Sequence, residues 1–568
     1  MIGINSKYTH TSLAIRQLVH YVKSQGDYDI DFKEYTINQD MHDILGKIME
    51  GSPDVLAFSC YIWNISKVMQ LAEAIKKGTN RIKILLGGPE VSYDTIDFMN
   101  KFPYVDYIIR GEGEKPLHEL LIKWGKGSLE GIAGLTFRKN NEVIHNEQEA
   151  SVIDMNELVY PYCGENNFSN QYIYYEASRG CPFNCSFCIS SNREGVRYLS
   201  VDRVKNDLDK LMKMQPKTIK FVDRTFNFNK YRTIEILDYI VKTNKNHCKI
   251  HLELTAEIID EELLTYFNQL PQDMFQFEIG VQSVNPRTLQ EVGRVSNFEK
   301  LARVVNRMME GNNAHIHLDL IAGLPGENYE SFKDSFNKVY HLGAHKLQLG
   351  FLKVLKGTTI HKKHKDYQIE FMDQAPYEVI KTQDMSFEEL LSLKRIEKLV
   401  TRYYDESRFS NTLNLITQHM TPFNFFEKFS DYWHVNHIDL VSHKRKDLYD
   451  YLNDFMINLI GLNGEESLLD DFLLSERDHE IPTFLYAKDE RSWIPYKHKL
   501  LKNTQFKEQY FKEYLDVPNK KLVNHFRLIE KGGKMVAYLY GSKDNIFERS
   551  KRIDVTHFFE GEDRWQTI

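Results

Sequence analysis

Three of the six cysteines stand close together in this chain, and they are the side chains best suited to chemistry. Cys181, Cys185 and Cys188 follow a C-x3-C-x2-C spacing within one short stretch. Three thiolates from one loop can hold three irons of a cubane iron–sulfur cluster, which leaves the fourth iron without a protein ligand. An iron with an open position can bind a small molecule, so the spacing predicts a site of cluster chemistry.

Zinc is the alternative for clustered cysteines. A structural zinc site takes four Cys or His ligands, usually as two pairs, and no second pair follows at a suitable spacing. The other cysteines, Cys60, Cys163 and Cys248, are scattered singly. Their isolation is typical of reduced and mostly buried thiols rather than of disulfides.

The stretch from Glu176 to Cys188, with Phe187 directly before the third cysteine, resembles the signature of the radical SAM superfamily. The resemblance implies a [4Fe-4S] cluster whose open iron binds the amino and carboxylate groups of S-adenosylmethionine. It also implies that one electron from the cluster cleaves this molecule to methionine and a 5′-deoxyadenosyl radical. An external one-electron donor, a flavodoxin or a ferredoxin, is then expected as a partner.

Strand and helix patterns alternate from residue 170 to residue 365, and they predict the fold that presents the cysteine loop. The loop would follow the first strand at its carboxyl end, where α/β barrels keep their active sites. Six strand–helix units predict a (β/α)6 partial TIM barrel with a lateral gap for a large substrate. The expected strands, taken together with the loops at their mouths, are 172–175, 218–226, 249–257, 275–283, 315–327 and 346–352.

Polar residues recur at the carboxyl ends of these strands. Buried carboxylates are costly unless they bind something, so the barrel mouth is expected to hold a polar ligand, and a zwitterionic nucleoside suits it. These residues are Asp223, Glu253, Glu257, Glu278, Gln282, Ser283 and Asp319.

Several of these segments resemble radical SAM motifs. The resemblance implies that the loop of Asp223 contacts the methionyl amino group and that Gln282 and Ser283 lie near the ribose and carboxylate. Arg294 matches an arginine that pairs with the methionyl carboxylate, which a guanidinium fork suits. Each residue could instead form a salt bridge or be a satisfied core group. The candidate S-adenosylmethionine ligands are Asp223, Glu253, Glu278, Gln282, Ser283, Arg294 and Asp319.

Residues 1–130 show a second alternation of strands and helices, which predicts a doubly wound, Rossmann-like sheet with any ligand across its strand ends. The Gly87–Glu90 and Gly111–Glu114 turns resemble those of the cobalamin-binding domain that precedes some radical SAM domains. The resemblance implies cobalamin as a third cofactor. Aromatic packing under the next domain is the alternative role for the two aromatic candidates. The candidate contacts are Tyr61, Trp63, Gly87, Gly88, Gly111 and Glu112.

Two features of this domain depart from the family pattern. Asp40 to Gly46 nearly spells the D-x-H-x-x-G motif that places a histidine on cobalt, but its glycine comes one position late and the stretch starts a helix. We therefore interpret His42 as a coincidence and expect no histidine to ligate cobalt from below. Only Met1 and Ile2 precede the Gly3–Tyr8 loop, which predicts that a central strand is missing and leaves a ligand-free, flavodoxin-like domain as an alternative.

The remaining segments carry fewer signals. Residues 131–169 are expected to be a linker, and residues 366–568 a mostly α C-terminal domain of unknown role. Ser386 and Glu389 form a capping box that opens a helix. Helical segments are expected over 413–429 and 441–462. The stretch 496–534 holds nine lysines among aromatics. A solvated amphipathic face is favoured there over an RNA-binding surface, so no nucleic-acid partner is expected.

Length and composition set the outer limits. The 568 residues are enough for about three domains. A formal net charge of −7 gives no general attraction to nucleic acid or membrane. The sequence shows neither an apolar run long enough to span a membrane nor a signal peptide, so a cytoplasmic location is expected.

The leading hypothesis is a cobalamin-dependent radical SAM methyltransferase that acts on an unactivated carbon. One alternative is a radical SAM cyclase or rearrangement enzyme in which cobalamin is absent or does not carry a methyl group. The other is a non-enzymatic iron–sulfur or corrinoid sensor.

Overall fold

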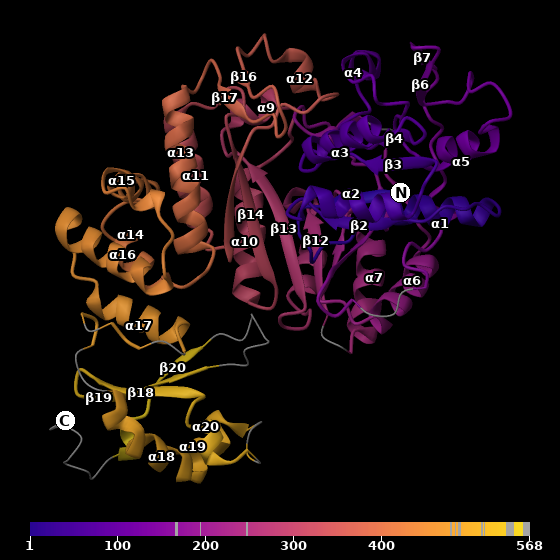
Figure 1. Cartoon of the computed structure of the whole chain (residues 1–568). Helices are drawn as coiled ribbons and strands as arrows, with labels where there is room; N and C mark the ends of the chain where they lie inside the picture. The colour runs from indigo at the N-terminus through magenta and orange to yellow at the C-terminus, as the bar shows by residue number, and fades with distance from the viewer. Residues whose placement is uncertain are drawn as a thin grey trace. The chain divides into compact units, whose positions relative to one another are not determined.

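The computed structural model divides the chain into two compact units, Met1–Leu391 and Ser392–Ile568. The first unit contains two largely parallel sheets with their helices (Figure 1). The described residues are 1–164, 168–192, 195–245, 248–477, 480–482, 484–486, 490–512, 515, 517–540 and 550–559.

The N-terminal sheet has seven strands in the order β2-β1-β3-β4-β5-β6-β7. Its first five strands are parallel and alternate with helices, as predicted for a doubly wound sheet. The elements are β1 Ile2–Asn5, α1 Leu13–Gln25, β2 Lys33–Thr36, α2 Met41–Glu50, β3 Val55–Ser59, α3 Ile65–Gly78, β4 Lys83–Gly87, α4 Thr95–Lys101, β5 Tyr107–Ile109, α5 Glu114–Lys123, β6 Leu135–Lys139 and β7 Glu142–His145.

The expectation of a missing central strand was wrong, because Ile2–Asn5 is that strand. It pairs in parallel with β2 over four residues and also with β3, and all four of its residues are buried. Gly3 suggested a loop, but its role is close packing. A Cβ atom there would lie 2.8 Å from Cδ1 of Ile15 and 2.9 Å from Cβ of Ser12, both next to α1 or within it. Glycine inside a strand permits such an approach.

The expected linker also differs from the structure. Part of it forms β6 and β7, which add to the sheet in antiparallel fashion beside β5. Leu135 and Thr136 of β6 are fully buried. The strands cover an edge of β5 that would otherwise present unpaired backbone groups.

The second sheet is the predicted partial barrel. Its six strands lie in the order β15-β14-β13-β12-β11-β8, all parallel, with helices between them (Figure 1). The elements are β8 Tyr172–Tyr175, β9 Ser178–Arg179, β10 Arg197–Tyr198, α6 Val201–Lys213, β11 Thr218–Phe221, α7 Lys230–Thr243, β12 Lys249–Leu254, α8 Glu261–Phe267, β13 Phe275–Gln282, α9 Pro286–Glu291, α10 Phe298–Gly311, β14 His315–Ala322, α11 Tyr329–Tyr340, β15 Lys346–Phe351 and α12 Thr359–Lys363.

The barrel strands alternate between apolar and polar residues. Ile250 and Leu252 of β12 are fully buried, whereas His251 between them lies on the other face with Gln276 of β13 and His317 of β14. Fully covered parallel strands usually read as continuous apolar runs. The concave face of this barrel is therefore polar well below its mouth.

The loop after β1 joins the two sheets. The backbone N–H of Tyr172 donates to the carbonyl of Thr9 over 2.7 Å, and His10 forms a parallel bridge with Tyr172. The Thr11 hydroxyl donates to the carbonyl of Tyr172 over 3.1 Å. This short segment covers the free edge of the first barrel strand, so the N-terminal domain completes one side of the barrel.

The first unit extends beyond the domain boundary expected at residue 366. The N–H groups of Val354 and Val379 donate across the barrel edge to Tyr377 and Leu352, both over 2.9 Å. The elements here are β16 Glu370–Phe371, β17 Val379–Lys381 and α13 Phe387–Leu399. The capping box before α13 is present: the Ser386 N–H donates to the Glu389 carboxylate, and the Glu389 N–H donates to the Ser386 hydroxyl.

The second unit is mostly helical and ends in an antiparallel sheet, β18-β19-β20. The helix expected over 413–429 is two helices, because Thr421 caps a new helix that has Pro422 at its start. The elements are α14 Ser410–Thr417, α15 Pro422–Val435, α16 Arg445–Ile460, α17 Glu465–Ser475, α18 Ile494–Lys502, α19 Thr504–Tyr510, α20 Asn519–Leu522, β18 Phe526–Lys531, β19 Lys534–Leu539 and β20 Lys551–Asp554.

The aromatic residues of the lysine-rich stretch belong to the core of this unit. Phe506, Phe511 and Phe526 are at most 4% exposed and pack in one cluster. Glu513, Tyr514 and Asp516 of the same stretch lie outside the described residues. Within the described part of the chain, no helix has both the length and the apolar character required to cross a membrane.

Candidate functional site

The cysteine loop follows β8 at the carboxyl end of the barrel, as predicted. Cys185 is buried, and Cys181 and Cys188 are half-buried. The N–H of Cys188 donates to the carbonyl of Cys185 over 3.1 Å. Burial raises the pKa of the Cys185 thiol, Arg294 opposes this rise, and the neighbouring thiols of Cys188 and Cys181 add to it. Three sulfurs thus share one small region beside an arginine.

The arrangement of the thiols differs from that of a single-metal site. Among the described residues, no three His, Cys, Asp or Glu side chains converge closely enough to hold one metal ion. A cubane cluster presents its irons at separate corners, so its three thiolates spread more widely than the ligands of one ion. The loop geometry is therefore compatible with the cluster.

Asp223 supports the cysteine loop from below. It is 2% exposed, and its carboxylate accepts hydrogen bonds from the Ala177 N–H over 3.0 Å and from the Ser178 hydroxyl. Burial raises its pKa to about 7, against these two hydrogen bonds. The sequence-based assignment of Asp223 as an S-adenosylmethionine ligand stays a prediction, and both of its oxygens already accept hydrogen bonds within the protein.

Ser283 also faces away from the barrel mouth. It is 1% exposed, and its hydroxyl donates to the Glu327 carboxylate over 2.6 Å, while Ser335 donates to the same oxygen over 2.9 Å. Burial raises the pKa of Glu327 to about 7. The expected role of Ser283 as an S-adenosylmethionine ligand stays a prediction, and its hydroxyl joins the end of β13 to the turn at Glu327.

Arg294 lies beside the cysteine loop, next to Cys185. Its Nη1 is 3.9 Å from the Sγ of Cys185, its Nη2 donates to the carbonyl of Gly280, and its Nε is buried without a partner. The side chain of Gln282 packs against the same glycine, since a Cβ atom on Gly280 would lie 2.2 Å from the Gln282 Nε2. The pairing with substrate carboxylate remains a prediction, and the geometry leaves one guanidinium nitrogen free for it.

Three carboxylates approach one another inside the barrel mouth. His251 Nε2 lies 2.8 Å from Glu278 Oε2, and Lys220 Nζ lies 3.4 Å from the same oxygen. Burial alone would raise the pKa of Glu278, but His251 and Lys220 lower it overall. Burial and the negative charge of Glu278 raise the pKa of Asp319, and burial also raises that of Glu253. The mouth thus holds one ionised carboxylate beside two that retain protons more readily.

A hydrogen-bonded chain continues below this group. The Gln276 Nε2 lies 3.2 Å from His251 Nδ1 and 3.3 Å from His317 Nδ1. The His317 Nε2 in turn lies 2.9 Å from His315 Nδ1. An amide nitrogen is a donor only, so both ring nitrogens that face it accept. Because His251 Nδ1 accepts from Gln276, His251 Nε2 carries the proton and donates to the Glu278 carboxylate.

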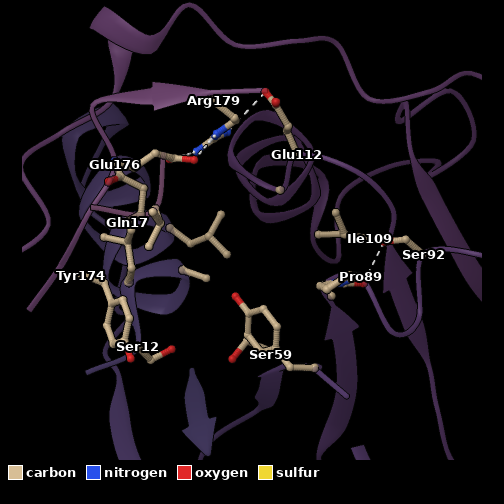
Figure 2. A pocket seen from close by; sticks show the side chains of 18 of the residues that line it. Ser12, Gln17, Ser59, Pro89, Ser92, Ile109, Glu112, Tyr174, Glu176 and Arg179 are labelled. Atoms are coloured by element: carbon tan, nitrogen blue, oxygen red, sulfur yellow. Dashed lines mark hydrogen bonds and ion pairs between the residues drawn. The ribbon is translucent and has the colours of Figure 1, made fainter. Parts of the chain in front are cut away.

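A cavity of about 700 Å³ lies between the carboxyl ends of the two sheets (Figure 2). Both halves of the first unit contribute to its wall. Residues from the N-terminal sheet and its loops include Ser59, Tyr61, Trp63, Gly87, Gly88, Gly111 and Glu112. Residues from the barrel include Tyr174, Glu176, Arg179, Lys220, Arg224 and Glu253.

All six predicted cobalamin contacts line this cavity. The rings of Tyr61 and Trp63 stack with their centroids 4.4 Å apart and an angle of 5° between the planes. Gly88 has φ +108, and a Cβ atom there would lie 2.6 Å from the carbonyl oxygen of Cys60. The glycine turn therefore permits a close backbone approach. His42, by contrast, is highly exposed at the start of α2 and does not line the cavity, in agreement with its interpretation as a coincidence.

Glu112 does not present a free carboxylate to the cavity. It contacts Arg197 and lies 3.4 Å from Arg179, and it accepts the N–H of Ile153 over 3.0 Å. Burial would raise its pKa, but the two arginines and the Ile153 N–H lower it. The predicted contact of Glu112 with cobalamin stays a prediction, and the carboxylate itself makes an ionic contact with the barrel.

Sequence reasoning missed several residues of the cavity wall. Glu176 and Arg179 stand just before the first cysteine, and Glu114 belongs to the turn that had been singled out, so proximity to known motifs was the available signal. Arg224 is exposed and lines the cavity, and among the described residues its guanidinium has no hydrogen bond or ion pair. His10 had no signal at all, because its contact, 2.6 Å from Nδ1 to the Tyr174 hydroxyl, joins two different domains.

Comparison with known proteins matches three domain families along the chain. The B12 binding domain matches residues 1–121, and the radical SAM superfamily matches residues 175–339. A protein family of unknown function, DUF4080, matches residues 365–543. Together these matches follow the order of the N-terminal sheet, the barrel and the mostly helical C-terminal part.

Two curated relatives match this chain at low identity. The cobalamin-dependent radical SAM methyltransferase TokK of Streptomyces tokunonensis is 25% identical over 326 residues, which cover 52% of this chain and 46% of TokK. The anaerobic magnesium-protoporphyrin IX monomethyl ester cyclase of Rubrivivax gelatinosus is 22% identical over 340 residues, which cover 57% of this chain and 60% of the cyclase. The chain thus spans about half the length of the curated relatives it matches.

A solved structure confirms the fold. The cobalamin-dependent S-adenosylmethionine radical enzyme OxsB, with aqua-cobalamin bound, superposes with a TM-score of 0.55 at 14% identity. The superposition covers 96% of this chain and 82% of OxsB. At this identity the likeness is one of fold.

A cubane-type cysteine loop on a partial barrel, preceded by a B12 binding domain, defines the cobalamin-binding class of radical SAM enzymes. The chain carries a B12 binding domain, a radical SAM domain and a C-terminal DUF4080 match in this order, and it thus combines the elements of this class. The expectation of an enzyme is confirmed, and the sensor alternative is not retained.

The two domain families imply a [4Fe-4S] cluster, S-adenosylmethionine and cobalamin, and the residues present fit these groups. Cys181, Cys185 and Cys188 would hold three irons of the cluster, and the fourth iron would have no protein ligand among them. Arg294 Nε and Asp319 Oδ1 are buried near that mouth without partners among the described residues. The cavity offers a stacked aromatic pair and glycine turns to a large flat cofactor.

Proposed function

We propose that this enzyme is a cobalamin-dependent radical SAM methyltransferase that transfers a methyl group to an unactivated carbon. The observation that carries the proposal is the shared cavity, whose wall comes from the cobalamin-binding sheet on one side and from the cysteine loop and barrel mouth on the other. A substrate in that cavity would touch both cofactor sites at once. The methyltransferase activity of TokK supports the same reading.

Different residues of the chain would bind the different cofactors. Cys181, Cys185 and Cys188 would hold the cluster, while Arg294 and Asp319 offer unpartnered polar atoms to S-adenosylmethionine. When bound, the cluster and S-adenosylmethionine supply hydrogen-atom abstraction, and cobalamin supplies a transferable methyl group. The protein orders these groups and keeps water away from a reactive site.

The cavity also indicates what kind of substrate it accepts. Arg224 presents an unpaired guanidinium to the cavity, and Glu253 lines the wall near it. A guanidinium without a protein partner is suited to a carboxylate or phosphate. We therefore expect the substrate to carry an anionic group in addition to the carbon that is methylated.

The test uses S-adenosylmethionine with a trideuterated methyl group. Anaerobically reconstituted enzyme is incubated with this molecule, a one-electron reductant and a small-molecule extract of the source cells. We expect one extract component to gain a trideuterated methyl group while 5′-deoxyadenosine and S-adenosylhomocysteine form together. Cys188→Ala should abolish all three products, and Cys163→Ala, an exposed cysteine outside the cluster, should leave them.

A radical SAM cyclase or rearrangement enzyme is the second candidate, favoured by the similarity to the cyclase of Rubrivivax gelatinosus. That activity would form 5′-deoxyadenosine without labelled methyl product and without S-adenosylhomocysteine. The same incubation therefore separates the two candidates.

The remaining expectations about partners follow from the chemistry. A flavodoxin or ferredoxin would supply the electron, in the cytoplasm. The burial of Phe506, Phe511 and Phe526 supports the expectation that no nucleic acid binds the lysine-rich stretch, because stacking on bases needs exposed rings.

A further inference from the structure

One guanidinium, that of Arg179, connects the cysteine loop with the cobalamin-binding sheet. Arg179 stands two positions before Cys181, and its Nη2 lies 3.0 Å from Glu114 Oε1 and 2.8 Å from Glu176 Oε2. Its Nη1 lies 3.4 Å from Glu112 Oε2. Glu112 and Glu114 belong to the turn between β5 and α5. Figure 2 shows Arg179 between Glu176 and Glu112, with its contacts marked.

This ionic group is buried. The side chains of Glu114 and Glu112 are 5% and 7% exposed, and that of Arg179 is 17% exposed. Arg197 adds a second guanidinium, which contacts Glu112 and donates to the carbonyl of Ile153 over 2.6 Å. A buried charge that loses its partner is strongly unfavourable, so each of these groups restricts the others. The turn and the loop cannot move apart independently.

The backbone transmits this restriction to the first cysteine. Gly180, the single residue between Arg179 and Cys181, has φ +107, and a Cβ atom there would lie 2.1 Å from the carbonyl oxygen of Gly195. Arg179 also pairs with Arg197 in the β9–β10 ladder. A displacement of the Arg179 backbone therefore displaces Cys181.

The same turn faces the cavity on its other side. Gly111, Glu112, Gly113 and Glu114 all line the cavity wall. A large cofactor in the cavity would therefore press against the residues that hold Arg179. Both sites thus contact one rigid ionic group.

We propose that Arg179, with Glu112 and Glu114, is a positioning group that couples the two cofactor sites, so that cobalamin stabilises the cluster-binding loop and the cluster tightens cobalamin binding. Thermodynamic linkage requires both effects to have the same factor. The proposal rests on the cofactors of the proposed function but not on methyl transfer.

The first measurement compares the affinity for hydroxocobalamin with and without the cluster. Equilibrium dialysis is performed anaerobically on the full chain, once after reconstitution with iron and sulfide and once without it. We expect the loaded protein to bind about 10-fold more tightly, within the usual range of coupling between sites. Hydroxocobalamin should also slow the release of iron to a chelator. Equal affinities in the two states, or no measurable hydroxocobalamin binding, would overturn the proposal.

The second measurement asks whether the ionic group carries the coupling. Glu114→Gln keeps the shape of the side chain and removes its charge, and we expect the affinity ratio to fall below about 3. Glu130→Gln is the matched control, because Glu130 is an exposed partner of Lys139 in the same domain. A change that only weakened the fold would lower both affinities and leave their ratio intact. An unchanged ratio in Glu114→Gln would therefore contradict the proposal.

Arg179→Lys provides a second variant in case Glu114→Gln does not fold. An ammonium group keeps the charge but cannot reach three carboxylates in a fixed fork. We expect its ratio to fall as well, with far-UV circular dichroism unchanged. Because the test measures binding and not turnover, its outcome does not depend on whether the enzyme transfers a methyl group.

Discussion

The backbone N–H of Ala177 donates to the carboxylate of Asp223 over 3.0 Å, from the end of β8 to the end of the neighbouring strand. The Ser178 hydroxyl donates to the other oxygen. These two bonds hold the chain at the point where it leaves the barrel wall and enters the cysteine loop. Asp223 therefore acts as a structural acceptor for the start of the cysteine loop, and its role as a ligand is open to test.

Replacement of Asp223 separates these two roles. In Asp223→Asn the amide oxygen can still accept the Ala177 N–H, and the amide nitrogen can donate to a rotated Ser178 hydroxyl. We expect iron content and S-adenosylmethionine affinity to stay within about 3-fold of wild type, equivalent to less than about 1 kcal/mol. Asp223→Leu leaves two donors unpaired and should lose most of the iron. A more than 10-fold loss of affinity in Asp223→Asn, with full iron, would restore the ligand role.

Glu327 should make the stability of the protein depend on pH. Its folded-state pKa is about 7, because burial favours the protonated form, whereas an unfolded glutamate titrates near about 4.3. Between these values the folded state binds the extra proton, so this contribution to stability is lost as pH rises through about 7.

Urea unfolding of the cofactor-free protein at about pH 5.5 and about pH 8, which together span the upper part of this window, tests the Glu327 prediction. Glu327→Gln should remove about 2 kcal/mol of the difference between the two pH values, because about 1.5 pH units separate pH 5.5 from the folded-state pKa. Glu330→Gln, an exposed glutamate on the same segment, should remove none of it. The same pH difference in wild type and Glu327→Gln would show that other groups cause it.

Gly88→Ala should disrupt the cobalamin-binding sheet at one turn. The new Cβ atom would combine an unfavourable φ of +108 with a contact of 2.6 Å to the backbone oxygen of Cys60. Gly125→Ala is the control, since Gly125 has φ +68 but no atom within 4 Å of its Cβ position. We expect a loss of about 1 to 2 kcal/mol in the control and of about 3 kcal/mol or more in Gly88→Ala. Equal losses would mean that the turn tolerates the methyl group.

Trp63 should report on cobalamin directly. Its ring stacks on Tyr61 in the cavity and is 48% exposed there. We expect hydroxocobalamin to quench tryptophan fluorescence, with most of the quenching lost in Trp63→Phe and retained in Trp124→Phe. Trp63→Ala should weaken hydroxocobalamin binding by about 2- to 10-fold, which corresponds to the free energy of one aromatic stacking contact. Unchanged quenching in Trp63→Phe would place the cofactor elsewhere.

Arg294 should contribute to S-adenosylmethionine binding through its unpartnered nitrogen. Arg294→Lys replaces a fork by a point charge, and we expect the affinity of the cluster-loaded protein to fall about 10- to 100-fold, the range of hydrogen bonds to charged groups. The measurement is equilibrium dialysis with labelled S-adenosylmethionine. Arg303→Lys, on the exposed face of α10, should have no effect. An unchanged affinity at full iron content would assign Arg294 to the support of Gly280 alone.

Local sequence patterns predicted those helices and strands well whose formation depends on residues nearby in the sequence. The alternation of strands and helices predicted both sheets, and the spacing of Cys181, Cys185 and Cys188 predicted the cluster loop. The exception was β1, where Gly3 suggests a loop by its conformational freedom. Only contact with α1 shows that a glycine is required there for close packing.

Which polar side chains are free for ligands was decided by tertiary structure alone. Asp223, Ser283 and Glu112 stand at strand ends or turns, as ligands do, yet each is occupied by a partner distant in sequence: Ala177, Glu327 and Arg197. A sequence shows the type of a side chain and its place on an element, and these determined the cofactor class. Whether a donor or acceptor is already satisfied depends on groups that only the packed fold brings within hydrogen-bonding distance, so the role of each residue was decided there.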